Sequence, residues 1–232
     1  MAGSDITINT ASGAMGGYLA MPASGRGPGL VVIQEIFGVN KVMRDLADGY
    51  AARGYIALCP DLFWRLQPGV QITDKTDAEW QQAFDLMNKF DPKTGVEDIQ
   101  ATIDTLRAMD GCTGKVGAVG YCLGGLLAYL TAARTNVDAT VGYYGVNIQT
   151  MLGEAANIKK PLMLHIAGKD EYVPPEAQKQ IAAGLKGNPH VATHTYPEMD
   201  HAFSRVGGKH YDHANAELAN GRTATFFRQH LS

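Results

Sequence analysis

Short apolar segments that alternate with stretches of helical periodicity most constrain the fold of this chain. Residues 30–33, 115–119 and 161–167 are apolar runs of strand length, and each is followed by a stretch with apolar residues at helical spacing. Such alternation indicates βαβ units, in which helices cover both faces of a mostly parallel sheet. The sequence therefore predicts the α/β class.

The same pattern predicts the order of the elements. We expect a hairpin within 1–28, strands at 30–33, 55–59, 115–119, 139–144, 161–167 and 191–196, and helices at 40–53, 77–89, 96–109, 123–134, 174–185 and 211–229. The sequence contains no Pro- or Ser-rich linker that would divide the chain and no internal repeat. We therefore expect one domain over residues 1–232.

Charge and cysteine content argue against several classes of protein. The chain has 20 Lys and Arg against 23 Asp and Glu, so its net charge of −3 does not favour a nucleic-acid-binding surface. Its three cysteines are too few for a disulfide framework, and the segment MAGSDITINT lacks the features of a signal peptide. The longest uncharged run, 116–133, is interrupted by glycines and divides into a strand and a helix. We expect a cytoplasmic protein that binds neither nucleic acid nor membrane.

The segment from Gly120 to Gly124 carries the clearest chemical signal. It reads Gly-Tyr-Cys-Leu-Gly between a predicted strand and a predicted helix, which is the nucleophile-elbow pattern with Cys122 in the usual place of serine. The nucleophile of an elbow lies on a sharp turn, so its neighbours two residues away must be small. The N–H of Leu123 lies at the helix N-terminus, which stabilises an oxyanion and favours the thiolate form of Cys122.

An acid and then a histidine must follow an elbow along the chain, and both are present. Asp170 follows the predicted strand at 161–167, and His201 follows the one at 191–196. The carboxyl ends of parallel strands meet at one edge, so we expect these residues and Cys122 to lie there together. Glu171 competes with Asp170 for the acid role, but the pattern Gly-x-Asp-x-x-Val-Pro favours Asp170.

An early strand–helix loop adds two candidate residues. Glu35 follows the first buried strand and is expected at the same edge of the sheet. In an elbow-bearing fold this loop supplies the second oxyanion N–H, here that of Ile36. Glu35 could instead form a simple ion pair with Arg205.

Together these motifs resemble those of the dienelactone hydrolase family over nearly the whole chain. The matching segments are QEIFGVN at 34–40, CPDLF at 59–63, VGYCLGG at 119–125, VGYYGV at 141–146, GKDEYVP at 168–174 and DHAFSR at 200–205. The resemblance implies a single-domain α/β-hydrolase fold without a cap domain, and an enzyme that hydrolyses cyclic enol-lactone esters. It also implies that Cys122, His201 and Asp170 form the triad and that Glu35 contacts the resting thiol. We expect no metal and no cofactor.

The mechanism that this resemblance implies is a gated nucleophile. The neutral thiol of Cys122 rests near Glu35 until substrate binding moves Glu35, promotes thiolate formation and turns the sulfur toward His201. The thiolate attacks the carbonyl carbon, and the N–H groups of Leu123 and Ile36 hold the oxyanion. Water activated by His201 then hydrolyses the thioester. Cysteine suits activated esters, such as enol lactones and aryl esters, better than amides.

The expected substrate contacts depart from the family pattern. The resemblance implies two arginines for a substrate carboxylate; Arg205 matches one of them, but Trp80 stands in the place of the other. Phe84 replaces a tyrosine and Ala202 replaces a serine. A carboxylate needs paired donors to offset its desolvation, so we expect a neutral or aromatic ester to be preferred. The residues expected to bind substrate are Phe37, Trp80, Phe84, Tyr144, Ala202 and Arg205.

Other interpretations stay open. Cys59 and Cys112 are expected to be structural thiols, and Trp80, Phe84 and Met87 could be a stripe of core residues. A thioesterase, an aryl esterase or a promiscuous phosphotriester hydrolase could use the same triad, and a non-catalytic binding protein could share the fold. In each case we expect a small-molecule partner and a monomer or weak homodimer.

Overall fold

The computed structural model describes residues 3–232, so residues 1 and 2, where the predicted domain begins, lie outside the described part. Contacts between Cα atoms group the chain into two compact units, Met1–Ala118 and Val119–Ser232. The first unit holds β1 (Ser4–Thr10), β2 (Gly13–Ala20), β3 (Gly27–Ile33), α1 (Lys41–Ala52), β4 (Ile56–Pro60), α2 (Asp77–Lys89) and α3 (Pro92–Ala108). Strand β5 (Cys112–Tyr121) runs across the boundary. One domain over 1–232 stays a prediction.

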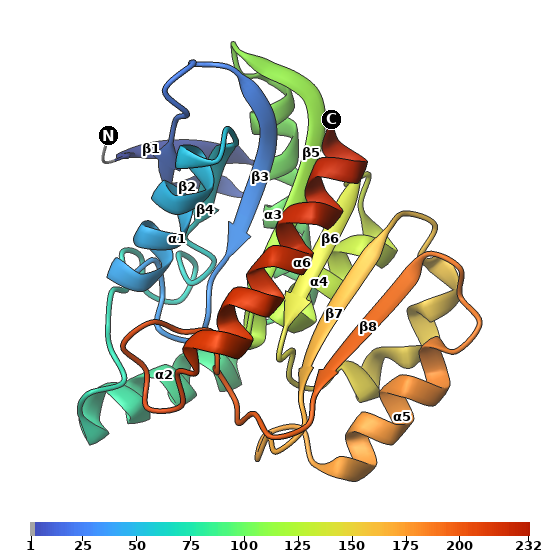
Figure 1. The fold of residues 1–232 in the computed structure, drawn as a ribbon. Helices are drawn as coiled ribbons and strands as arrows, with labels where there is room; N and C mark the ends of the chain where they lie inside the picture. The colour runs from blue at the N-terminus through green and yellow to red at the C-terminus, as the bar shows by residue number, and fades with distance from the viewer. Residues whose placement is uncertain (1–2) are drawn as a thin grey trace. The chain divides into compact units, whose positions relative to one another are not determined.

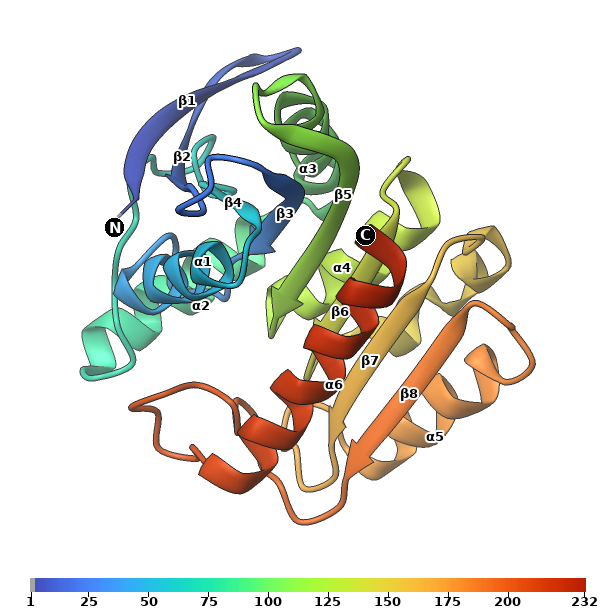
Figure 2. The same ribbon diagram turned by 45° about the horizontal axis from the view of Figure 1, so that its top comes forward.

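The second unit continues the alternation of strands and helices. Its elements are α4 (Leu123–Arg134), β6 (Ala139–Tyr143), the 3₁₀ helix η1 (Ile148–Asn157), β7 (Leu162–Ala167), α5 (Pro175–Leu185), β8 (Val191–Tyr196) and α6 (His213–Leu231). Helix α6 crosses the near face of β6 and β7, and α4 lies behind them (Figures 1 and 2). Ten residues of α4 are buried, so neighbouring elements cover most of the surface of this helix.

The strands form one eight-stranded sheet in the order β1-β2-β4-β3-β5-β6-β7-β8. The pairs β3–β4, β6–β7 and β7–β8 are parallel, whereas β1–β2 and β2–β4 are antiparallel. The predicted α/β class with a mostly parallel sheet is thus confirmed. In the second unit, β7 and β8 end at the same edge (Figure 1), which places the loops that follow them side by side.

Helix starts in the first unit are set by polar caps. The side chain of Asn40 accepts a hydrogen bond from the N–H of Met43 at the start of α1. Asp91 caps α3 by accepting from the N–H of Lys93, and Pro92 occupies the first turn, where its missing N–H costs nothing. Strand β3 is buried along nearly its whole length, which explains its unbroken apolar sequence.

None of the helices within residues 3–232 has both the length and the apolarity that are needed to cross a bilayer. All three cysteines are free thiols, and Cys59 and Cys122 are buried. Burial raises the pKa of the Cys59 thiol far above its ordinary value, so that sulfur is a poor nucleophile.

Candidate active site

Cys122 lies on a strained turn between β5 and α4 in the second unit. Its backbone adopts φ 57° and ψ −115°, which a residue with a side chain rarely occupies. The N–H of Cys122 donates to the carbonyl oxygen of Tyr143 at 3.1 Å, and this bond ties the turn to the end of β6. The residue is 8% exposed, so Cys122 is buried but not completely shielded from solvent.

Glycines around the turn make this geometry possible. A Cβ atom on Gly120 would overlap the carbonyl oxygen of Gly124, which is backbone and cannot move aside. A Cβ atom on Gly125 would lie 2.6 Å from the Cα atom of Gly145. Both contacts are too close for any side chain, so the small residues flanking the predicted elbow have a direct steric cause.

The start of α4 leaves backbone amides available beside Cys122. The carbonyl oxygen of Cys122 accepts from the N–H groups of Gly125 at 2.9 Å and Leu126 at 3.4 Å, which closes the first turn of the helix. The N–H of Leu123, the first helical residue, precedes these bonds and cannot take part in the helical ladder. Together with the positive end of the helix dipole, this amide suits a developing negative charge.

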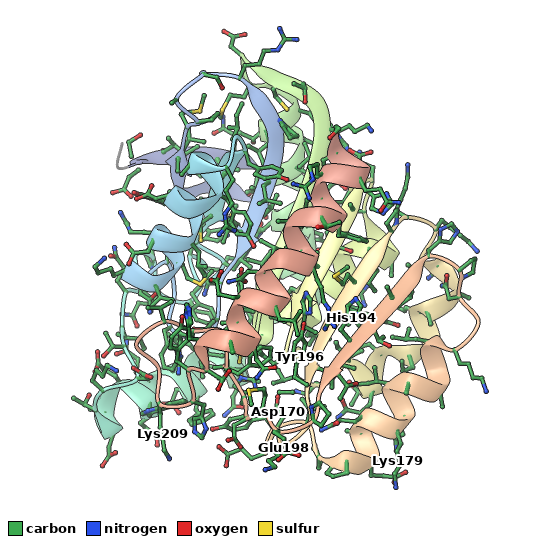
Figure 3. All side chains as sticks on the ribbon, in the orientation of Figure 1. Asp170, Lys179, His194, Tyr196, Glu198 and Lys209 are labelled. Atoms are coloured by element: carbon green, nitrogen blue, oxygen red, sulfur yellow. The ribbon has the colours of Figure 1, made fainter. Side chains whose placement is uncertain are left out.

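Asp170 and His201 lie together at the carboxyl edge of β7 and β8. The Nδ1 atom of His201 is 2.8 Å from Oδ2 of Asp170, and the Asp170 side chain is almost fully buried. Oδ1 of Asp170 accepts from the N–H of Tyr172 at 2.9 Å, which fixes the orientation of the carboxylate. Figure 3 labels Asp170 beyond the ends of these strands. The acid thus holds the imidazole with Nε2 directed away from it.

The protonation of His201 depends on both of its partners. Burial alone would lower its pKa, but the ionised sulfur of Cys122 and the carboxylate of Asp170 outweigh that effect, and the pKa of His201 rises to about 10. A hydrogen bond to the Cys122 side chain contributes to this rise. Cys122 and Asp170 thus both favour the protonated form of the His201 imidazole.

Three more predicted residues lie near His201, one by ring contact and two by position along the chain. The ring of Tyr144 stands edge-on to the His201 ring at 5.1 Å, and its hydroxyl group is 3.0 Å from Oγ of Ser204. Ala202 is buried with φ 61°, and the half-buried Arg205 follows three residues later. The structure brings Tyr144 and the segment from 201 to 205 together around the imidazole.

Tyr172 is a neighbour of His201 that the sequence analysis missed. Its ring lies 4.9 Å from the imidazole in an edge-on arrangement, although 40% of the residue is exposed. Its position two residues after Asp170 was the available signal, because the loop that carries the acid must pass close to the histidine.

The remaining predicted residues lie in the first unit. Glu35 and Ile36 follow β3 and are buried. Phe37 stands edge-on to Trp80 at 5.0 Å, and Trp80 stacks on Phe84 at 5.5 Å. Phe84 is 36% exposed, whereas the buried residues of α2 are Ala83 and Leu86. Phe37, Trp80 and Phe84 thus form one aromatic cluster, which is exposed to solvent at Phe84.

Metal chemistry needs a cluster of ligands. Among residues 3–232, no group of three or more His, Cys, Asp or Glu is arranged to hold a metal ion.

Comparison with known proteins identifies the family. The Dienelactone hydrolase family profile matches residues 15–231. A protein of Azospirillum brasilense named "Putative carboxymethylenebutenolidase" is 53% identical, covering 98% of this chain and 99% of its own. The carboxymethylenebutenolidase of Pseudomonas putida is 40% identical, covering 91% of this chain and 89% of its own. A crystal structure from Klebsiella pneumoniae, described as "Putative Dienelactone Hydrolase", superposes with a TM-score of 0.86 at 25% identity and covers 98% of each chain. The chain therefore belongs to the dienelactone hydrolase family, and the predicted enzyme class, a hydrolase of carboxylic esters, is confirmed.

Proposed function

We propose that the chain is a cysteine-dependent hydrolase of activated esters or lactones in which Cys122 is the nucleophile, His201 the general base and acid, and Asp170 the residue that orients His201. The 2.8 Å contact between Asp170 and His201 carries the proposal, because it holds the imidazole beside a cysteine on a strained elbow. A nucleophile, a base and an orienting acid together suit ester hydrolysis through an acyl-enzyme.

The reaction follows from the roles of these groups. The Cys122 thiolate attacks the carbonyl carbon, and the oxyanion accepts a hydrogen bond from the N–H of Leu123. The tetrahedral intermediate collapses to a thioester, and the imidazolium of His201 gives its proton to the departing oxygen. Water then attacks the thioester and gives a proton to His201. The carboxylic acid leaves, and the thiolate–imidazolium pair is restored.

Glu35 and Ile36 complete the proposed machinery by resemblance to the family. We propose that Glu35 gates the Cys122 thiol and that the N–H of Ile36 is the second oxyanion donor. Both residues are buried directly after β3, in the loop that supplies this donor in elbow-bearing folds. A Glu35→Gln variant should keep the fold and change the rate of thiol alkylation in the resting enzyme.

We propose a neutral aryl or bulky ester as the preferred substrate. Trp80 and Phe84 stand where the family resemblance implies polar contacts, and with Phe37 they form a partly exposed aromatic cluster. An aromatic surface gains from burying an aryl group but cannot offset the desolvation of a carboxylate. The curated relatives are named carboxymethylenebutenolidases, so an anionic lactone is the natural comparison.

Substrate preference is tested by comparing kcat/KM for a dienelactone with kcat/KM for neutral aryl esters, in the wild type and in Trp80→Arg. The wild type should favour the neutral esters, and Trp80→Arg should shift the ratio toward the lactone by about tenfold or more. A wild-type preference for the lactone by orders of magnitude would overturn this assignment.

The catalytic role of Cys122 is tested by turnover of a p-nitrophenyl ester. Cys122→Ala should lose about a thousandfold or more of kcat/KM. Cys112→Ala, which removes a partly exposed thiol elsewhere in the chain, is the matched control and should keep wild-type activity. Equal rates for the wild type and Cys122→Ala would end the nucleophile assignment. We further propose a cytoplasmic enzyme that works as a monomer or weak homodimer and binds no nucleic acid.

A further inference from the structure

A chain of buried polar groups runs beneath α6 in the second unit, and the mechanism above does not use it. His165, on β7, is almost completely buried and bonds at both ring nitrogens. Its Nδ1 atom is 2.8 Å from the hydroxyl oxygen of Tyr196, and its Nε2 atom is 3.0 Å from Oγ1 of Thr223. Beyond these partners, Arg222 donates to the hydroxyl oxygen of Tyr196 at 3.1 Å. A buried set of bonds this complete is costly to break.

The bonds around His165 have one direction. Arg222 can only donate, so the Tyr196 hydroxyl oxygen accepts from it, and we assign the hydroxyl hydrogen to the bond with Nδ1 of His165. With this assignment His165 is neutral and carries its hydrogen on Nε2, directed at Thr223. Burial, with the nearby His194 and Arg222, lowers the pKa of His165 to about 3, in agreement with a neutral ring. Tyr196 is therefore held in one orientation.

The backbone of Tyr196 meets both loops of the candidate site. Its carbonyl oxygen accepts from the N–H of Gly168, two residues before Asp170, at 2.8 Å. It also accepts from the N–H of Met199, two residues before His201, at 3.1 Å. Tyr196 is the last residue of β8, and Figure 3 labels it near the end of that strand.

The ring of Tyr196 adds a third connection to the histidine loop. It packs against Phe203, two residues after His201, with ring centroids 4.7 Å apart. The guanidinium of Arg222 lies over the same ring, 5.4 Å from the centroid of the Tyr196 ring. The position of the Tyr196 side chain thus bears on the chain both before and after His201.

We propose that Tyr196 is a positioning residue: its hydroxyl, held between His165 and Arg222, fixes the end of β8 and thereby the spacing of Asp170 and His201. The proposal rests on the proposed function only for its effect on turnover. Tyr196 is not a catalytic residue, because it acts through the two loops that its backbone and ring hold. Without the hydroxyl, the ring would keep its packing but lose its anchor, and the contact between Asp170 and His201 would loosen.

The test compares Tyr196→Phe with Thr223→Val. Each variant removes one buried hydroxyl that is hydrogen-bonded to His165, at Nδ1 for Tyr196 and at Nε2 for Thr223, but only Tyr196 contacts the two loops. Tyr196→Phe should lower kcat for a p-nitrophenyl ester by about tenfold with KM changed less than twofold. Thr223→Val should keep kcat within twofold, although both variants lower the midpoint of urea unfolding.

A second measurement does not depend on turnover. The titration of His201, followed by NMR, should move to lower pH in Tyr196→Phe and stay in place in Thr223→Val, because a looser contact with Asp170 stabilises the imidazolium less. The variant leaves unchanged the other groups that face His201, which are Cys122, Tyr144 and Tyr172. If the wild type shows no Cys122-dependent turnover, the proposed function fails and the titration still tests the positioning role.

Two results would overturn the proposal. One is equal kcat and an equal His201 titration in Tyr196→Phe and the wild type. The other is an equal loss of kcat in Tyr196→Phe and Thr223→Val, which would show a general structural effect. If Tyr196→Phe does not fold, Arg222→Met replaces it in the test. Arg222 is only half-buried, and its substitution by methionine removes a donor to the Tyr196 hydroxyl. A change in the same direction of about threefold then supports the proposal, and wild-type values contradict it.

Discussion

At the scale of single residues, the strained backbone of Cys122 depends on what its neighbours lack. Gly120 has no side chain, which leaves room for the carbonyl oxygen of Gly124. Any other residue at position 120 would prevent the elbow from forming. Gly120→Ala should therefore lower the free energy of unfolding by about 3 kcal/mol, because the backbone at Gly124 cannot move aside as a side chain can. The same substitution should abolish esterase activity. Urea unfolding and p-nitrophenyl ester turnover measure the two effects.

Gly221→Ala is the matched control for that substitution. Gly221 lies within α6, and no heavy atom lies within 4 Å of the position its Cβ would take. Alanine there should raise the free energy of unfolding by about 0.5–1 kcal/mol, since it favours the helix, and should leave activity unchanged. Equal stability of Gly120→Ala and the wild type would refute the steric account of the elbow.

The site residues that belong to a sequence motif could be predicted from the sequence. The residues that contact them only in the folded structure could not. Asp170 and His201 follow strands that end at one edge, so their contact follows from topology. The edge-on approach of Tyr172 to His201 depends on the path of a single loop. The bond between His165 and Thr223 joins a strand to a helix far along the chain, and no local pattern marks it.

At the scale of secondary-structure elements, polar caps determine where helices begin. Asn40 caps α1 by accepting from the N–H of Met43, and its amide also donates to the carbonyl oxygen of Ile72 at 2.9 Å. Asn40→Ala should lower the free energy of unfolding by about 1–2 kcal/mol, since both bonds are lost at a buried position. Asn40→Ser keeps a capping oxygen but loses the bond to Ile72, so its loss should be intermediate. Urea unfolding of the three proteins checks the order, and a Ser variant as unstable as the Ala variant would contradict the capping role.

The ends of elements are where sequence and structure differ most. Helix α3 begins at Pro92 rather than at the predicted residue 96, because the cap at Asp91 sets the start before the first core-facing residues appear. Strand β5 begins at Cys112 rather than 115, since its first residues are largely exposed and lack an apolar pattern. Helix α6 begins at His213 rather than at Tyr211, because Asp212 caps it. Apolar periodicity locates the buried middle of an element, and hydrogen bonds decide its ends.

At the scale of the whole molecule, two histidines with opposite pKa shifts shape the dependence of stability on pH. The pKa of His165 falls from 6.5 to about 3 because the ring is buried and faces His194 and Arg222. Between these pH values the unfolded chain binds a proton that the folded chain does not, so folding becomes less favourable as pH falls from 6.5 toward 3. The pKa of His201 rises to about 10, so its contribution is complete below pH 6.5 and is lost as pH rises toward 10.

His165→Gln separates the contribution of His165 to the loss of stability at low pH from the contribution of the carboxylates. The wild type should lose up to about 1.4 kcal/mol of unfolding free energy per pH unit to His165 between pH 6 and 4. The variant is less stable at neutral pH but should show a shallower slope over that interval. Urea unfolding at a series of pH values measures both slopes, and parallel curves would show that His165 is not held neutral in the fold.

The central claim is that Cys122 carries the acyl group during turnover. Acid quenching of the enzyme during hydrolysis of p-nitrophenyl acetate, followed by peptide mass spectrometry, tests it most directly. We predict one acetyl group on the peptide that contains Cys122, in greater amount when His201→Gln slows deacylation, and none on the peptides with Cys59 or Cys112. Steady product formation without any acylated Cys122 peptide in either enzyme would contradict the thioester mechanism.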